Sequence, residues 1–221
     1  MRVYLATTSL DDIRWANDAG LIDGVVATPT IIASESPQAE AREVIAEIAR
    51  ASRLTVCASV PAVAAADIVK GARDLRKITE RLIIAVPFID DAVPAIRRLT
   101  ADGIQVAATL VYSVAQGVLA ARAGAAMVTI SVDALDAVGD DGERVIRGLR
   151  TAFDHSAAEC DVAAAGPATA ASFAAAAIAG ADAAIVTPEV LRSLLQHPLT
   201  DRGLDRFLGA IVRRPKARRT K

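Results

Sequence analysis

The sequence is poor in cysteine, in aromatic residues and in lysine. Its two cysteines, Cys57 and Cys160, lie far apart, which disfavours both a disulfide framework and a cysteine-based metal site. Aromatic residues make up only 3% of the 221 positions, so we expect a core of aliphatic side chains. Only four of the 25 basic residues are lysines, which leaves few candidates for an amine nucleophile: Lys70, Lys77, Lys216 and Lys221.

Long apolar runs are missing as well. No segment approaches the roughly 20 apolar residues that a membrane-spanning helix requires. The first residues form a short strand-like run that ends in the polar stretch 7–9, and they lack the long apolar centre of a secretory signal. We therefore expect a cytoplasmic protein that does not contact a membrane.

Alanine is abundant, with 49 residues among the 221. Elements that pack on such small side chains must approach one another closely, and alanine is also the best helix former. Short β-branched runs alternate with alanine-rich amphipathic stretches along the whole chain. The runs predict eight strands: Val3–Ala6, Gly24–Ala27, Leu54–Ser59, Leu82–Val86, Ile104–Thr109, Met127–Ser131, Asp161–Ala165 and Ala183–Val186.

The stretches between the strands have the spacing of helices. They include Ala39–Ala51, Ala62–Arg76, Asp91–Leu99, Ser113–Ala123, Asp141–Phe153 and Ala168–Ala179, and two further helices are expected at Pro188–Leu195 and Asp201–Val212. Eight strands that each lead into a helix predict an α/β fold, a single (β/α)8 TIM barrel with a C-terminal helical extension. The competing doubly wound sheet would require a glycine-rich turn after the first strand, and residues 6–10 contain no glycine.

The chain divides into a barrel with its C-terminal helix, residues 1–212, and a basic tail, residues 213–221. The tail carries six positive charges, so the net charge of −1 conceals a charge of −7 on residues 1–212. Such a tail could bind a polyanion, remain solvated, or dock on the acidic body of a neighbouring subunit. We do not expect nucleic-acid binding, because the tail has no aromatic side chain that could stack on bases.

From Val3 to about Leu208 the sequence resembles the small bacterial transaldolases, in particular fructose-6-phosphate aldolase and its short relatives. The resemblance rests on short motifs in a fixed order: Tyr4-Leu5, Gly24-Val25, Pro29, Ile31-Ile32-Ala33, Val86-Pro87, Thr109, Tyr112, Ala115-Gln116-Gly117, Ala123-Gly124-Ala125, Asp136 and Gly139. It implies a (β/α)8 barrel that assembles into a homo-oligomer, a pentamer or a decamer, with a C-terminal helix that reaches a neighbour. It also implies class I aldol chemistry through a Schiff-base lysine late in the fourth strand. We expect no cofactor, and no metal site either, because Asp133 and Asp136 have no histidine or third carboxylate at ligand spacing.

The residues of that chemistry are replaced in this sequence. Ala85 stands at the position of the Schiff-base lysine, and the positions of the acidic residue and the acid/base tyrosine hold Ala6 and Ser131. The resemblance further implies a strand-2 asparagine, a strand-3 glutamine, an arginine and a phosphate-loop serine, and here these positions are Thr28, Ser59, Ala134 and Gly166. Nucleophile, proton shuttle and phosphate clamp are thus all altered together.

Several polar residues are nevertheless expected at the C-terminal ends of the strands, where barrel enzymes place their sites. The candidate pocket for a small metabolite comprises Thr28, Ser59, Thr109, Tyr112, Gln116, Ser131 and Gly166. The alternative interpretation is that these residues are barrel-layer and helix-cap residues with no ligand. We expect Cys57 to be a small core residue, Asp133 and Asp136 to serve a turn and a helix start, and Asp90 and Asp91 to cap the helix after strand 4.

Three functions remain compatible with the residues. The chain could be a non-catalytic relative with a binding or structural role. It could be a carbohydrate-metabolism enzyme of aldehyde-lyase or transferase type that uses lysine-independent chemistry on a small carbonyl or sugar. It could also retain some aldolase activity through an amine supplied by the tail of a neighbouring subunit.

Overall fold

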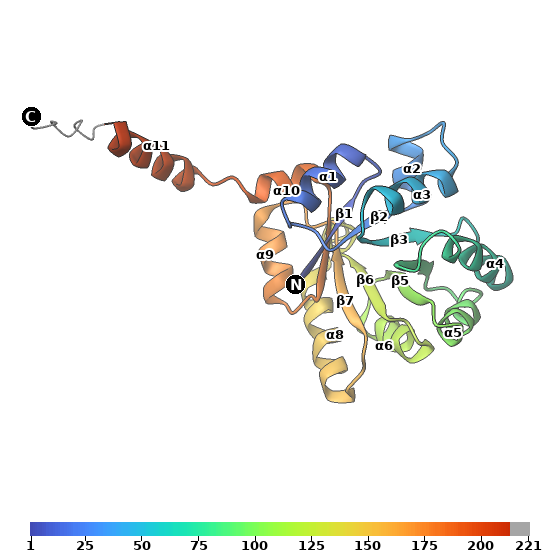
Figure 1. Cartoon of the computed structure of the whole chain (residues 1–221). Helices are drawn as coiled ribbons and strands as arrows, with labels where there is room; N and C mark the ends of the chain where they lie inside the picture. Colours follow the sequence, from blue (N-terminus) through green and yellow to red (C-terminus); the bar gives the residue numbers. More distant parts are fainter. Residues whose placement is uncertain (213–221) are drawn as a thin grey trace, which may run out of the picture.

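A computed structural model describes residues 1–212, and it is a closed barrel of eight parallel strands in which each strand pairs with its neighbours in the sequence and β8 returns to β1 (Figure 1). This confirms the predicted (β/α)8 barrel. The strands are β1 (Arg2–Ala6), β2 (Gly24–Ala27), β3 (Thr55–Ser59), β4 (Leu82–Pro87), β5 (Gln105–Val111), β6 (Met127–Ser131), β7 (Asp161–Ala165) and β8 (Ala183–Val186).

Helices surround the barrel and cover the outer face of its strands (Figure 1). They are α1 (Leu10–Asp18), α2 (Pro29–Glu35), α3 (Ala41–Ala51), α4 (Ala65–Arg76), α5 (Val93–Ala101), α6 (Val114–Ala123), α7 (Val132–Ala137), α8 (Gly142–Ser156), α9 (Ala170–Ile178), α10 (Pro188–Leu194) and α11 (Pro198–Val212). Helices α1, α2 and α7 were not among the stretches recognised from periodicity, and α2 and α7 have seven residues or fewer.

The prediction that Asp90 and Asp91 cap the helix after β4 is wrong. Helix α5 begins at Val93, its N-cap is Ala92, and no side chain caps it. Asp90 and Asp91 belong to the preceding turn, in which the Ala92 N–H donates to the Ile89 carbonyl. Because Pro94 lies in the first turn and has no N–H to satisfy, the helix has less need of a side-chain cap.

Alternate residues of each strand point into the barrel and form an interior cluster that is separate from the outer core. The cluster consists of Tyr4, Val26, Cys57, Ile83, Ala85, Ala107, Met127, Ala163 and Ala183. At the N-terminal ends of the strands, an ion pair between Arg2 and Asp161 joins β1 to β7. The middle of the interior is therefore apolar, and a charged pair closes its N-terminal end.

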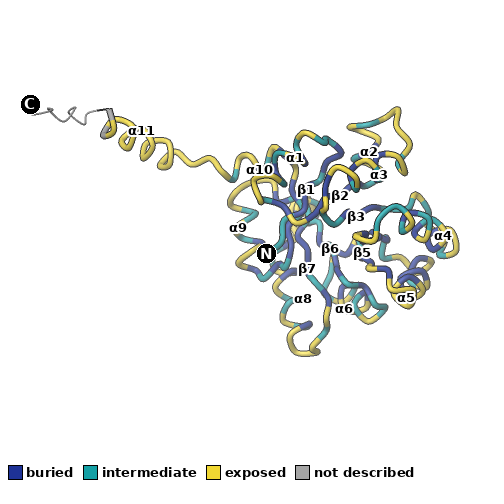
Figure 2. Tube along the Cα trace, viewed as in Figure 1, coloured by how far each residue is buried: buried dark blue, intermediate teal, exposed yellow. Residues whose placement is uncertain are grey.

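Helix α11 stands away from the barrel, and its described side chains are exposed (Figures 1 and 2). The predicted basic tail, residues 213–221, lies outside the described residues. None of the helices within residues 1–212 combines the length and the apolar character needed to cross a bilayer.

Gly117 allows close contact between α6 and α8, because a Cβ atom built there would lie 2.3 Å from Leu149 Cδ2. Leu149 is fully buried and cannot move freely. We therefore expect Gly117→Ala to lower the free energy of unfolding by about 1–3 kcal/mol, measured by denaturant titration.

Gly203→Ala is the matched control, since nothing lies within 4 Å of a Cβ atom at this position of α11. We expect it to change the free energy of unfolding of the barrel by less than about 0.5 kcal/mol. Equal destabilisation by the two substitutions would contradict the packing account.

Burial raises the pKa of the Cys57 thiol to about 12, and burial is also the main cause that raises the pKa of Cys160 to about 12. Since the thiolate is the reactive form, both cysteines stay protonated near neutral pH. We expect the native protein not to react with an aromatic disulfide reagent at about pH 8, and both thiols to react in guanidinium chloride. Rapid reaction of one thiol in the native protein would show that the thiol is accessible.

Candidate functional site

The C-terminal ends of the eight strands form the mouth of the barrel, the end at which TIM-barrel enzymes place their sites. Ala85 lies near this end of β4, is 4% exposed, and points into the interior. Its register partners are Ser59 on β3 and Ala107 on β5. A lysine at this position would thus have entered the barrel, and here the interior receives only a methyl group.

Two hydroxyl groups flank Ala85 and have no protein partner among the described hydrogen bonds. Ser59 ends β3 beside Ala85, and Thr109 pairs in register with Pro87 at the end of β4. Both side chains are half-buried and share the inward faces of Cys57 and Ala107. These two members of the predicted pocket can therefore donate to or accept from a small molecule.

Other members of the predicted pocket form local hydrogen bonds at the starts of helices. Thr28 is the N-cap of α2, where its Oγ1 accepts from the Ile31 N–H at 3.3 Å. Gln116 Oε1 accepts from the Tyr112 N–H at 2.9 Å, next to the cap of α6. Tyr112 itself is exposed at the rim of the mouth and precedes the helix. The structure thus places these three side chains around the mouth, with Thr28 and Gln116 engaged in local hydrogen bonds.

The ends of β6 and β7 meet in a small polar cluster. The Ser131 hydroxyl donates to Asp133 Oδ1 at 2.8 Å, and the Ala134 N–H donates to the same oxygen at 2.9 Å. Gly166 has a φ of 78°, and a Cβ atom there would lie 2.5 Å from Asp133 Oδ1. The expected helix-start role of Asp133 fits these contacts, but the approach of its carboxylate to Gly166 was not predicted.

A bulge interrupts β5 between Ala108 and Val111, at the same end of the barrel. Leu110 lies inside it with a φ of 58°, a left-handed conformation that is unusual for a bulky residue. Its side chain is 52% exposed beside the rim. No sequence signal announces this conformation, because glycine and asparagine, not leucine, favour it.

A second polar cluster joins the loop after β1 to the end of α2, and sequence reasoning missed it. Glu35 Oε2 accepts from the Thr7 hydroxyl at 2.8 Å, from the Thr8 N–H at 2.6 Å and from the Thr8 hydroxyl at 3.0 Å. These residues border a hollow of about 380 Å³ that also includes Asp12 and Glu189. Arg192 pairs with Asp12 at 2.8 Å, which is the largest cause of the lowered pKa of Asp12.

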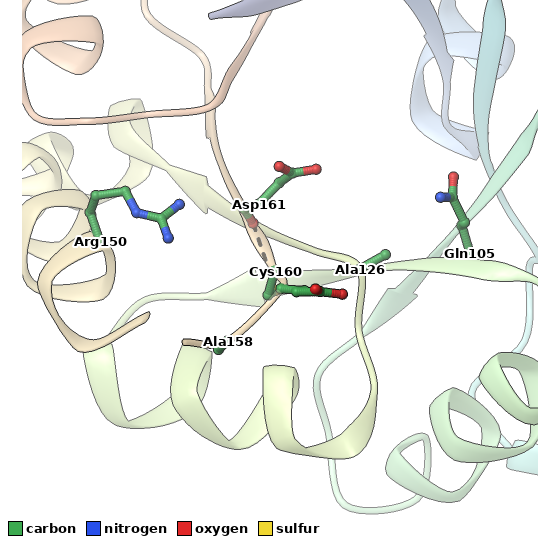
Figure 3. A pocket seen from close by; sticks show the side chains of 7 residues that line it. Gln105, Ala126, Arg150, Ala158, Cys160 and Asp161 are labelled. Atoms are coloured by element: carbon green, nitrogen blue, oxygen red, sulfur yellow. Dashed lines mark hydrogen bonds between the residues drawn. The ribbon is translucent and has the colours of Figure 1, made fainter. Parts of the chain in front are cut away.

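A larger hollow, of about 410 Å³, opens at the opposite end of the barrel (Figure 3). Gln105 and Asp161 line it at the starts of β5 and β7. Its Arg150 side chain already pairs with Asp182 at 2.6 Å and with Asp154 at 3.2 Å. Since charged residues at this end usually stabilise a TIM barrel, the mouth is the better candidate site.

Titratable groups are scarce in the barrel interior. Burial raises the pKa of Tyr4, so its phenol stays protonated at neutral pH. Cys57 is likewise protonated. Within residues 1–212, no group of three or more His, Cys, Asp or Glu side chains is arranged to hold a metal ion.

Comparisons with known proteins agree with this architecture. The family model "Transaldolase/Fructose-6-phosphate aldolase" matches residues 3–217. A probable transaldolase of Heliobacterium modesticaldum is 39% identical over 208 residues, covering 94% of this chain and 96% of the relative. A probable transaldolase of Rhizobium meliloti is 37% identical over 208 residues, covering 94% of this chain and 95% of the relative.

A solved structure of 3-hexulose-6-phosphate synthase superimposes with a TM-score of 0.66 and covers 88% of this chain and 98% of that one. At 17% identity this likeness concerns the fold alone. The resemblance to the family is stronger. The family model matches nearly the whole sequence, and the two curated relatives are 39% and 37% identical. The chain belongs to the transaldolase/fructose-6-phosphate aldolase family.

Proposed function

We propose that this chain is a non-catalytic member of its family that binds a small metabolite at the barrel mouth. The observation that carries the proposal is Ala85, a buried methyl group at the position where the resemblance implies the Schiff-base lysine. The described lysines offer no replacement. Lys70 lies on the exposed side of α4 and Lys77 caps the end of that helix, where it pairs with Asp74 at 2.7 Å.

The surroundings of Ala85 support the same conclusion. A class I aldolase needs an acid/base group within hydrogen-bond reach of the reacting carbon, in addition to the amine. The inward residues at the mouth carry hydroxyl groups, at Ser59, Thr109 and Ser131, and methyl groups, at Ala6 and Ala85. Hydroxyl groups can hold a polyol, but they titrate far from neutral pH and are poor proton shuttles there.

A lysine-independent enzyme of carbohydrate metabolism is the second candidate, and one observation favours it. Asp133 is a carboxylate bound to the Ser131 hydroxyl at the mouth, and a carboxylate can serve as a general base. A panel of unphosphorylated sugars and small carbonyl compounds, followed by mass spectrometry of the products, separates this candidate from a binding protein. Turnover that Asp133→Asn abolishes would favour the enzyme.

We further propose that the protein is a cytoplasmic homo-oligomer. Helix α11 carries exposed apolar side chains at helical spacing, namely Leu204, Phe207, Leu208 and Ile211. Burial of each such side chain is worth roughly 1.5–3 kcal/mol, which favours a partner for this face. The resemblance suggests that other copies of the chain supply it.

One prediction of the proposed function concerns Schiff-base chemistry. Treatment of the wild-type protein with dihydroxyacetone and borohydride should give no stable mass increase in intact-protein mass spectrometry, because neither lysine within residues 1–212 lies at the mouth. Cleavage of fructose 6-phosphate should stay at background, since loss of proton transfer alone commonly costs about 10²–10⁴-fold in rate.

Ala85→Lys serves as the positive control for trapping. Its amine would sit in an apolar interior, which lowers the pKa of a lysine and increases the fraction of free nucleophile. We expect this variant, once circular dichroism shows it to be folded, to be trapped by borohydride. A stable adduct on the wild-type protein would overturn the proposal and direct attention to an amine from the tail of a neighbouring subunit.

Another prediction concerns assembly. Light scattering during size-exclusion chromatography should give a mass several times the 22.9 kDa of one chain. Leu208→Glu should lower that mass, because a charge in an apolar interface is costly to desolvate.

Arg206→Glu introduces the same residue on the opposite, polar face of α11 and should leave the assembly intact. A wild-type protein that elutes as a monomer would contradict the assembly proposal. So would a mass that falls equally in both variants.

A further inference from the structure

Helix α6 exposes apolar side chains on the side that faces away from the barrel. Val118 and Leu119 are 40% and 57% exposed in the middle of the helix, and Ala115 is exposed one turn before them. Arg122 is the only charged residue in α6. A surface helix normally carries polar and charged residues on its outer side, so this side is typical of a surface that a partner covers.

Hollows lie on both sides of these exposed residues. One of about 320 Å³ lies between α5 and α6, and Ile89, Val93 and Leu119 contribute apolar lining to it. Another of about 250 Å³ lies between α6 and α8 and includes Val118. Val118 and Leu119 therefore form a ridge between two grooves, and a further helix packs well on such a surface.

The hollow between α5 and α6, which we call the α5–α6 groove, is also basic. Arg97 and Arg122 line it, and both side chains are exposed. None of the ion pairs within residues 1–212 includes either arginine. The carboxylate of Asp90 lines the groove as well, which leaves a net positive charge. The groove thus suits a helix that has an apolar side with acidic residues next to it.

Helix α11 of this chain has the required apolar side. It stands away from the barrel, and its described side chains are exposed (Figures 1 and 2). Four apolar residues of the helix, each between 49% and 62% exposed, recur at spacings of three and four: Leu204, Phe207, Leu208 and Ile211. This spacing places them on one side of the helix.

The charges of α11 are divided about this apolar side. At about 100° per residue, Asp201 and Asp205 lie at one edge of it, whereas Arg202 and Arg206 lie on the far side. The ion pairs within residues 1–212 do not include Asp201 or Asp205. The helix therefore presents apolar and acidic residues together, and their charge is opposite to that of the α5–α6 groove.

Helix α11 cannot reach the groove of its own barrel. Three residues, 195–197, join α10 to α11, and they span about 10 Å when fully extended. By the shorter way around the barrel, α8 and α9 lie between α6 and α10 (Figure 1). A helix with its side chains is about 10 Å wide, so these two helices alone occupy about 20 Å. Only another copy of the chain can supply α11 to this groove.

We infer that α11 of one copy docks in the α5–α6 groove of the next copy, with its apolar side on Leu119 and its acidic edge against Arg97 and Arg122. The inference rests on the proposed homo-oligomer and adds the surface that receives the helix. Because the donating and receiving surfaces differ, each copy contacts two neighbours, and the contact closes into a ring when its rotation allows.

Two variants that each remove one half of the contact test the inference. Leu208→Glu places a charge on the donating helix, and Leu119→Glu places one in the receiving groove. Each variant alone should have the mass of a single chain in light scattering. An equimolar mixture should give a dimer of twice the 22.9 kDa of one chain, because the mixture keeps one intact helix and one intact groove.

Val138→Glu is the matched control for Leu119→Glu. Val138 is an apolar residue with a 79% exposed side chain, and it lines neither hollow. The substitution should leave the mass of the oligomer unchanged. Since Leu119 is more than half exposed, we expect both variants to keep the circular dichroism spectrum of the wild-type barrel.

A charge reversal tests the groove without altering its apolar residues. Arg97→Glu combined with Arg122→Glu should raise the protein concentration at which the oligomer dissociates by at least about tenfold at low salt, because two attractive pairs become repulsive. Adding Asp201→Arg and Asp205→Arg to the same chain should restore the wild-type value. Both arginines are exposed, so this variant also serves if Leu119→Glu does not fold.

The inference is overturned if Leu119→Glu or the arginine reversal keeps the assembly of the wild-type protein, or if the equimolar mixture remains monomeric. In those cases the proposed homo-oligomer still stands when Leu208→Glu alone lowers the mass, and α11 then contacts another surface. A wild-type protein that is monomeric contradicts the inference and the proposed homo-oligomer together.

Discussion

The interior of an eight-stranded parallel barrel holds only a fixed volume of side chain, and this limit governs the rest of the molecule. Tyr4 is the one aromatic residue of the interior cluster, and it is matched by Gly24 on the neighbouring strand. A Cβ atom at Gly24 would lie 2.4 Å from Tyr4 Cε1. Alanines at 107, 163 and 183 fill much of the remaining interior, so the barrel closes on small side chains.

The small apolar side chains of the interior also determine which chemistry the barrel mouth can support. Ala85 and Ile83 both lie on the inward face of β4. Nearer the mouth, inward positions of the neighbouring strands carry hydroxyl groups. The polar groups thus lie at the rim, where the Ser131 hydroxyl at the end of β6 donates to Asp133, whose carboxylate lies next to Gly166 after β7. An apolar interior with a polar rim suits reversible binding of a small hydrophilic molecule better than covalent chemistry on a buried amine.

Sequence periodicity predicted the barrel because its signals are local. The β-branched run Met127–Ser131 and the alanine-rich run Asp161–Ala165 coincide with β6 and β7, since parallel strands buried on both faces require continuous apolar residues. The sequence predictions failed where backbone geometry, rather than residue composition, determines the local structure. Leu110 adopts a left-handed conformation that leucine does not favour, and α5 begins after Asp90 and Asp91 because Pro94 sets its first turn.

The candidate site was predictable only in part, for a related reason. The positions of Ala85, Ser59 and Thr109 follow from strand alternation, which a sequence reveals. The approach of Asp133 to Gly166 joins two elements that are 33 positions apart, and neither residue alone predicts it. A glycine with positive φ is a common loop feature, and an aspartate at a helix start is equally common. Only their contact turns two ordinary local signals into a charged group with a defined place at the mouth.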